Sequence, residues 1–342
     1  MPVTLQIIAD QTGLSVTTVS RILNNKSQKY RISDRAKSLV LETARQLNYR
    51  PNQVARSLRL KKTQTIGLIV PDISNPFFAH VTRNIQKNVF NNGYSLIVCN
   101  TDEDINNEKE QLELLRRKNV DGFIIMAVGI EYEHIIDLQR DNIPFVLLDR
   151  CFEEVNTNSV VVDNFDGAFL ATEHLIQNGH RRIAIIQGLV NTYTNSVRVE
   201  GYRYALKKYN IPIEESLIVG NDFREENGYI ETKLLLNMDQ PPTAIFTTSD
   251  LITLGAYKTI HEENLSIPDD ISIIAFDDID FAKYLQAPLT VIRQPENMMG
   301  EAAVKLLFED INNSSSNHKK RIVLKPELII RDSVLKLPAG EA

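Results

Sequence analysis

Short apolar runs alternate with amphipathic stretches along most of this sequence, and this alternation constrains the possible folds most strongly. The apolar runs lie at 65–70, 94–98, 121–127, 144–148, 159–162, 182–187, 243–248 and 271–276. They are continuous rather than alternating in polarity, which is typical of strands in parallel sheets whose two faces are covered by helices. Because so many units exceed one doubly wound sheet, we predict two lobes with a ligand crevice at the carboxyl ends of their strands.

Charge is distributed unevenly along the 342 residues, although the whole chain carries a formal charge of only −6. Residues 1–62 contain 12 lysines and arginines against 3 aspartates and glutamates, and the remaining residues contain 26 against 41. The formal charge is therefore +9 in the first segment, which we call the head, and −15 in the rest, which we call the body. This asymmetry is typical of a soluble protein that binds nucleic acid through its basic part.

The head has the pattern of short helices joined by tight turns. Gly13 interrupts the first helix, Ser15 is a candidate N-cap for the second, and Ser33 for the third. The positions expected to face a shared core are Leu5, Ile8, Ala9, Thr12, Val19, Ile22, Leu23, Ala36, Leu39, Val40, Thr43, Ala44 and Leu47. The opposite face of the second helix carries Val16, Thr17, Ser20 and Arg21. This arrangement predicts a helix-turn-helix whose second helix enters a DNA major groove.

Residues 50–62 predict a short hinge helix followed by a linker. Pro51 ends the preceding helix and can begin a new one. Val54 and Leu58 lie one turn apart, and Arg56 and Arg59 add positive charge. A helix of two turns is marginal alone in water, so we expect it to form only when packed against a symmetry mate and DNA.

Two segments resemble the lactose/galactose repressor family of bacterial transcription regulators: VTLQIIADQTGLSVTTVSRILNN and LNYRPNQVARSLRLKKTQTIGLIVPDISNPFF. The likeness continues over essentially the whole chain. It implies an α/β protein with a helix-turn-helix domain at 1–49, a hinge helix and linker at 50–62, and a body of two doubly wound parallel sheets that resembles periplasmic sugar-binding proteins. The expected N-terminal lobe comprises 63–162 with 291–324, and the expected C-terminal lobe comprises 163–290 with 325–342.

The resemblance also implies which residues contact DNA. In that family the second helix reads the major groove, and a leucine of the hinge helix is inserted into a central minor-groove step. Arginine can bond bidentately to guanine, and an apolar side chain can unstack a base step, so Arg21 and Leu58 suit these roles. The full expected set is Thr4, Ser15, Val16, Thr17, Ser20, Arg21, Asn24, Tyr49, Asn52, Ala55, Arg56 and Leu58.

The head departs from the family pattern in two places. Ile7 stands where many members carry an acidic residue. The turn at 26–32, KSQKYRI, is longer than the common form. Its two lysines and arginine suit either additional phosphate contacts or a solvated loop, and the sequence leaves both interpretations open.

Polar and aromatic residues recur where the predicted strands of the body end. Carboxylates and arginines bond vicinal hydroxyls, and aromatic faces cover the C–H faces of a sugar ring, so the set predicts a monosaccharide site. Its expected members are Asp72, Asn75, Phe77, Phe78, Asp149, Arg150, Arg198, Phe223, Ser249, Asp277 and Gln294. Most of these positions also match sugar contacts of ribose-type periplasmic proteins, but Ser249 replaces the usual asparagine, which puts ribose itself in doubt. Two arginines also permit a sugar phosphate or a sugar acid.

Several other classes of protein are disfavoured by the sequence. The chain lacks a phosphate-binding loop, a nucleophile elbow and metal-ligand spacing, so we expect neither an enzyme nor a bound metal or cofactor. Arg150 and Arg198 are expected to keep Asp149 and Asp277 ionised, which suits binding rather than proton transfer. The two cysteines exclude a disulfide framework. Neither a membrane span nor a signal peptide is evident, so we expect a cytoplasmic protein.

Together these features predict a repressor that binds a palindromic operator as a homodimer and responds to a sugar between its lobes. Closure of the lobes on the effector would alter the spacing of two marginal hinge helices. Release from DNA on sugar binding is the expected response, and co-repression by the same parts is the alternative that the sequence leaves open. The sequence does not identify the target genes or the operator.

Overall fold

The computed structural model describes residues 3–49, 62–129, 131–152, 154–312 and 319–338. The chain divides into two compact units, Met1–Thr63 and Gln64–Ala342. Most of the predicted hinge, including Asn52, Ala55, Arg56 and Leu58, lies outside the described residues.

Over its described residues, 3–49 and 62, the head contains three helices, α1 (Leu5–Thr12), α2 (Val16–Leu23) and α3 (Asp34–Gln46). The side-chain oxygens of Thr4, Ser15 and Ser33 cap them by accepting backbone N–H groups, which confirms the last two as N-caps. Gly13 ends α1 with φ +65°, a left-handed conformation that glycine adopts without a steric penalty.

The core of the head is small and follows the predicted helical spacing with one exception. Its buried side chains are Ile8, Ala9, Val19, Ile22, Val40 and Ala44. Leu39 was expected to face this core, but it is 45% exposed. Val40 and Ala44, one turn apart on α3, bury its inward face, which turns the adjacent Leu39 toward the surface.

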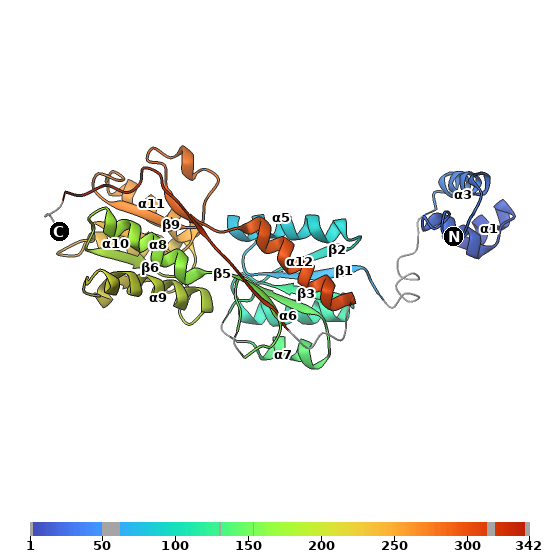
Figure 1. Cartoon of the computed structure of the whole chain (residues 1–342), viewed down its shortest axis with the longest axis horizontal. Coiled ribbons are helices and arrows are strands. Elements are labelled where there is room, and N and C mark those ends of the chain that lie inside the picture. Colours follow the sequence, from blue (N-terminus) through green and yellow to red (C-terminus); the bar gives the residue numbers. More distant parts are fainter. Residues whose placement is uncertain (1–2, 50–61, 130, 153, 313–318, 339–342) are drawn as a thin grey trace. The chain divides into compact units, whose positions relative to one another are not determined.

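The body contains two six-stranded sheets, each covered by helices on both faces (Figure 1). The first sheet has the order β11-β5-β4-β3-β1-β2, and all its pairings are parallel. Its strands are β1 (Thr65–Val70), β2 (Ser95–Asn100), β3 (Gly122–Ile125), β4 (Phe145–Leu148), β5 (Asn158–Val162) and β11 (Arg321–Leu324). The helices α5 (Pro76–Asn91) and α12 (Glu296–Asn312) bury one face, whereas α6 (Ile105–Arg117) and α7 (Glu133–Arg140) bury the other.

The second sheet has the order β12-β10-β9-β8-β6-β7, and its β10–β12 pair is antiparallel. Its strands are β6 (Ile183–Ile186), β7 (Ile218–Val219), β8 (Ala244–Thr247), β9 (Ser272–Phe276), β10 (Thr290–Arg293) and β12 (Glu327–Ile329). One face packs against α10 (Glu225–Leu236) and α11 (Asp250–Glu262), and the other against α8 (Asn164–Gln177) and α9 (Tyr193–Lys208). Two short 3-10 helices, η1 (Glu215–Leu217) and η2 (Ala282–Tyr284), complete the described elements.

The chain passes between the lobes after β5, after β10 and after β11. The second passage differs from the expected boundary between residues 290 and 291, because β10 pairs with β9 in the second sheet. Val291 and Ile292 are fully buried there, so the chain returns to the first lobe only after Arg293. The two-lobe α/β fold and the parallel sheets predicted from the sequence are confirmed.

Candidate functional site

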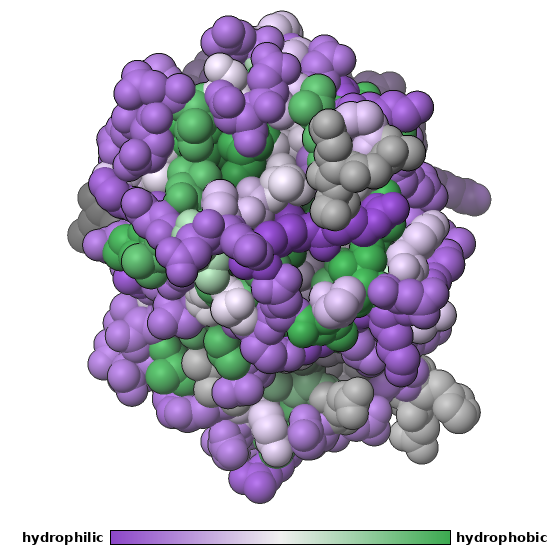
Figure 2. Space-filling view, turned by 90° about the vertical axis from the view of Figure 1, so that its left-hand side faces the viewer, coloured by the Kyte–Doolittle hydropathy of each residue, from purple (hydrophilic) through white to green (hydrophobic). Residues whose placement is uncertain are grey.

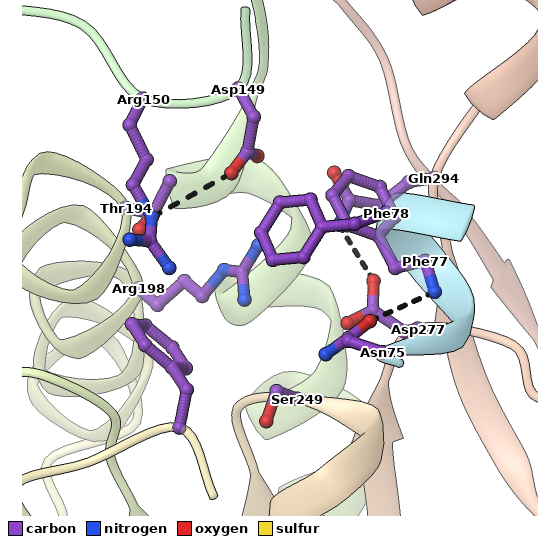
Figure 3. Close-up of a pocket in the computed structure, with 11 residues that line it drawn as sticks. Asn75, Phe77, Phe78, Asp149, Arg150, Thr194, Arg198, Ser249, Asp277 and Gln294 are labelled. Atoms are coloured by element: carbon purple, nitrogen blue, oxygen red, sulfur yellow. Dashed lines mark hydrogen bonds and ion pairs between the residues drawn. The ribbon is translucent and has the colours of Figure 1, made fainter. Parts of the chain in front are cut away.

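A cavity between the two lobes gathers the strand-end residues of both sheets (Figure 3). Ten of the eleven residues expected to bind an effector line it, together with Thr194. The complete lining is Asn75, Phe77, Phe78, Asp149, Arg150, Thr194, Arg198, Phe223, Ser249, Asp277 and Gln294. These residues follow β1, β4, β6, β7, β8, β9 and β10, because the carboxyl ends of parallel strands meet in the crevice between the lobes.

Asp72 is the expected site residue that does not line this cavity. Its Oδ1 accepts hydrogen bonds from the Ser74 backbone N–H at 2.8 Å and from the Ser74 hydroxyl at 2.6 Å. The carboxylate therefore stabilises the turn that leads into α5. Asn75 then caps that helix by accepting from the Phe77 N–H at 2.9 Å, which places Phe77 and Phe78 in its first turn at the cavity.

Two buried aspartates enter the cavity from opposite lobes. Asp149 follows β4 and Asp277 follows β9, and both have left-handed backbones, with φ of +68° and +83°. Such conformations are uncommon outside glycine and occur preferentially at functional sites. Asp149 has a buried Oδ1 without a hydrogen-bond partner, and Asp277 accepts a 2.6 Å bond from the Gln294 amide. An oxygen in this position is available to a ligand hydroxyl.

Burial outweighs the neighbouring arginines in setting the protonation of these aspartates. It raises the pKa of Asp149 to about 6, although Arg150 and Arg198 pull that pKa down. Burial and the nearby Asp250 raise the pKa of Asp277 to about 7, again against Arg198. The arginines were expected to keep both carboxylates ionised, but burial opposes them, because removing a carboxylate from water disfavours its charged form and lifts both pKa values toward neutrality.

Arg150 is fixed by acceptors of its own lobe. Its Nη1 and Nη2 donate to the two carboxylate oxygens of Glu103 at 2.7 and 2.8 Å, and Nη1 also donates to the carbonyl of Val128 at 2.7 Å. The guanidinium is 2% exposed and lies 5.1 Å from the ring centroid of Phe223. Both of its terminal nitrogens are thus occupied by protein oxygens.

Arg198 projects from α9 of the second lobe and is also held by protein acceptors. Its Nε donates to Asn164 Oδ1 at 2.8 Å, and its Nη1 donates to the Thr248 carbonyl at 2.5 Å. Its guanidinium stacks 3.6 Å from the ring centroid of Phe276. Thr194, which the sequence reasoning missed, lies one turn earlier on α9, so helical spacing from Arg198 was the signal that could have found it.

Polar contacts join the lobes around the cavity. Asn75 Nδ2 of the first lobe donates to Asp250 Oδ1 of the second at 2.8 Å, and Ser249 caps the helix that begins at Asp250. At the rim, the Arg224 guanidinium donates to the Asp102 carbonyl at 3.1 Å.

The space enclosed by the residues that line the cavity is about 30 Å³, whereas pockets for small molecules usually exceed 300 Å³. Binding of a sugar ring therefore requires the lobes to part or the lining side chains to move.

The head presents its candidate nucleic-acid interface on α2. Thr17 is exposed, and Ser20 and Arg21 are half-buried on this helix. Val16 was predicted to lie on the same solvent face, but it is half-buried and packs against the head core. Thr4 and Ser15 are the caps of α1 and α2, so they lie at helix N-termini, where backbone N–H groups favour phosphate.

Two other expected DNA contacts have structural partners in the head. Asn24 donates from its amide to the Ser20 carbonyl at 2.7 Å. Tyr49 packs against the head core, and burial raises the pKa of its hydroxyl.

Comparison with known proteins assigns the family. Residues 4–52 match the bacterial regulatory proteins of the lacI family, and residues 63–331 match the periplasmic binding proteins and sugar binding domain of LacI family. This chain belongs to the LacI family. Its relatives are transcriptional repressors rather than enzymes.

Two relatives of this LacI-family chain match it over nearly its whole length. It is 36% identical to the ribose operon repressor of Haemophilus influenzae, over 98% of this chain and 99% of the relative. It is 38% identical to the transcriptional repressor PurR of Haemophilus influenzae strain PittEE, over 97% and 98%. The chain is therefore a LacI-family transcriptional repressor with a sugar-binding type of body.

Two solved structures are similar to this LacI-family protein. The lac repressor dimer bound to operator and the anti-inducer ONPF has a TM-score of 0.85 at 26% identity and covers 98% of this chain and 100% of that one. The LacI family regulator from Enterococcus faecium with bound ribose has a TM-score of 0.73 at 34% identity and covers 80% and 100%.

None of the helices in the described ranges combines the length and apolar character that a bilayer crossing requires. Over the same residues, no three histidine, cysteine, aspartate or glutamate side chains are grouped so as to hold a metal ion.

Proposed function

We propose that this LacI-family protein binds a palindromic operator as a homodimer in the bacterial cytoplasm and represses genes of carbohydrate metabolism under the control of a neutral monosaccharide. The observation that carries the effector class is the pairing of Arg150 with Glu103 beside two buried aspartates. An anionic sugar needs a free guanidinium fork, and here that fork is occupied. Hydroxyl groups of a neutral sugar instead suit the acceptors Asp149, Asp277 and Gln294.

Aromatic rings at the cavity support the same effector class. Phe77 and Phe78 lie edge to face with their centroids 5.1 Å apart in the first lobe, and Phe223 lines the cavity from the second. Rings on both lobes can cover the two C–H faces of a pyranose or furanose while the carboxylates take its hydroxyls. The ribose-bound relative from Enterococcus faecium, in its own crystal structure, is consistent with a sugar of this size.

A thermal-shift panel of neutral pentoses and hexoses, sugar phosphates and sugar acids tests the effector class. One or more neutral sugars are expected to raise the melting temperature of the full chain by several degrees, because a ligand that binds the folded state stabilises it by mass action. Sugar phosphates and acids are expected to have no effect. Stabilisation by anionic sugars alone would overturn the proposal.

The variant Glu103→Gln gives the panel a matched control. It removes the charge that occupies the Arg150 fork while it keeps the shape of the side chain. Sugar acids are expected to stabilise this variant more than the parent protein. An unchanged preference for neutral sugars would show that the Arg150–Glu103 pair does not set the charge of the effector.

Exposed apolar side chains on the body support assembly with a second copy. Phe90 at the end of α5 is 77% exposed, and Leu234 on α10 is 60% exposed one turn from Ile230. Figure 2 shows an end of the second lobe that is largely hydrophilic, with separate hydrophobic patches between the polar groups. Adjacent exposed apolar side chains, such as Ile230 and Leu234 on one face of α10, are candidates for contacts between subunits when they form a contiguous patch. Sedimentation of the full chain is expected to give a dimer, and Phe90→Asp with Leu234→Asp is expected to shift it toward monomer.

The sugar is proposed to release the operator. It would replace the Asn75–Asp250 contact between the lobes and so change the spacing of the two hinge helices in a dimer. Gel shifts with the sugar identified by the panel test the sign of this response. Tighter operator binding with sugar would make the protein co-repressed.

A further inference from the structure

The longer turn between α2 and α3 places an aromatic ring against a residue of the expected DNA-reading face. The guanidinium carbon of Arg21 lies 3.8 Å from the centroid of the Tyr30 ring. This is well inside the distance of about 6 Å within which a cation is attracted to an aromatic face. Tyr30 belongs to the 26–32 segment, by which this chain departs from the common family pattern.

The turn holds the ring by backbone contacts of its own. The Lys26 N–H donates to the Arg21 carbonyl at 2.9 Å, and the Ile32 N–H donates to the Ser27 carbonyl at 3.0 Å. Ser27 is 6% exposed, so the beginning of the turn is buried against the head. Tyr30 itself is 42% exposed, so its ring forms part of the surface beside α2.

We propose that Tyr30 is a positioning residue that presents Arg21 to a base pair of the operator. The inference rests on the proposed function in one respect, that α2 enters the major groove. The five N–H donors of arginine lie in the plane of the guanidinium, so a ring against its face leaves the donating edge free. Arg21 can therefore stack on Tyr30 and donate two hydrogen bonds to guanine O6 and N7 at the same time.

The stacking also restricts Arg21 before DNA binds. A long flexible side chain loses rotamer freedom when it forms a fixed contact, and that loss weakens binding. An arginine that is already held against Tyr30 loses less rotamer freedom when it binds DNA. The contact thus strengthens discrimination at the base pair that Arg21 reads, and it leaves the other positions of the operator unaffected.

The test compares the DNA preferences of full-length variants. Wild type, Arg21→Ala, Tyr30→Phe and Tyr30→Leu are each used to select from a random pool of double-stranded DNA. Arg21→Ala is expected to lose the preference for one guanine in each half-site. Tyr30→Leu is expected to weaken the preference at that same position about three- to fivefold, the scale of an exposed cation–π contact, whereas Tyr30→Phe retains it because it keeps the ring face.

Lys29→Ala is the matched control in the same turn. It removes a charge without touching the ring, so it is expected to weaken binding to all sequences alike and to reduce the dependence on salt. The thermal melt of each variant checks that the head is folded, and Tyr30→Gln provides a second residue without an aromatic face if Leu disturbs the turn.

Two results would overturn the role of Tyr30. One is a set of preferences for Tyr30→Leu and Tyr30→Gln identical to that of wild type. The other is an equal loss of preference at every position of the operator, which would mean that Tyr30 only supports the structure of the head. A wild-type protein that selects no sequence at all would instead refute the proposed function on which the inference rests.

Discussion

The head and the body present their functional side chains in different surroundings. In the head, the candidate DNA-reading residues of α2 lie within two turns, are exposed or half-buried, and rest on six buried side chains. In the body, the cavity residues come from seven strand ends spread over more than 200 positions, and Asp149, Arg150, Arg198 and Asp277 are each at most 6% exposed. The DNA-reading residues come from one short stretch of sequence and bind their ligand at a solvated surface. The cavity residues come together only when the whole body folds, and they bind their ligand where water is excluded.

The difference predicts opposite responses to salt, and the effect on the head is the largest. Counterions are released when the basic head contacts phosphates, so operator affinity is expected to fall about a thousandfold between 50 and 200 mM salt. Sugar affinity is expected to change little, because the body site is buried and screened poorly by ions. Fluorescence anisotropy with a selected duplex measures the operator affinity, and calorimetry with the sugar measures the sugar affinity. A flat salt dependence of operator binding would contradict the role assigned to the head.

Asp277→Asn tests the buried site. The amide keeps the shape of the side chain but removes the charged acceptor, and hydrogen bonds to charged groups are the stronger ones, so sugar affinity is expected to fall about 100-fold. Operator binding without sugar is expected to persist, and the melting temperature should not fall, since the variant removes a buried carboxylate.

Asp72→Asn is the control for this variant. It changes another aspartate of the predicted set, but one whose carboxylate bonds Ser74 outside the cavity. Calorimetry should give an unchanged sugar affinity for Asp72→Asn. Equal losses in the two variants would show that the cavity described here is not the sugar site.

Leu58→Ala tests the hinge, which is expected to bind DNA together with the head. Its side chain is expected to open a minor-groove step, so its truncation should weaken operator binding about tenfold and leave sugar affinity alone. Leu60→Ala, two positions along the same segment, is the matched truncation. Anisotropy titrations in which both variants bind like wild type would refute the hinge assignment.

The smallest effect concerns pH and arises only in the body. Sugar hydroxyls donate to ionised carboxylates, whereas the free protein holds Asp149 and Asp277 with pKa values of about 6 and 7. Near neutral pH protons must therefore leave when sugar binds, and affinity is expected to fall several-fold as the pH drops from 8 to 6.5. Calorimetry in two buffers with different ionisation enthalpies detects the released protons. An affinity that rises toward acid pH would mean that the sugar prefers the protonated carboxyls.

The sequence predicts the fold well where short-range patterns decide it. The run 65–70 coincides with β1, and Ser15 and Ser33 are caps as predicted. The strands β7, β10, β11 and β12 were not predicted, because each takes its place from pairing with distant segments of the chain.

The ionisation and the pairing of the site residues are harder to predict from the sequence than which residues form the site. Ten of the predicted residues converge at the cavity, yet Glu103 was not foreseen, because its role depends on which loop folds beside Arg150. The rise in the pKa values of Asp149 and Asp277 was also not foreseen. The sequence shows which charges are neighbours, but it does not show how completely water is excluded from them.

The three passages of the chain between the lobes determine the order in which the protein can be completed during synthesis. The first lobe lacks α12 and β11 until residues 296–324 have left the ribosome, and the second lobe lacks β12 until residue 329 has. The head has a core of its own and can fold before either lobe is finished. A nascent chain thus acquires its DNA-reading helix long before it acquires the sensor that controls it.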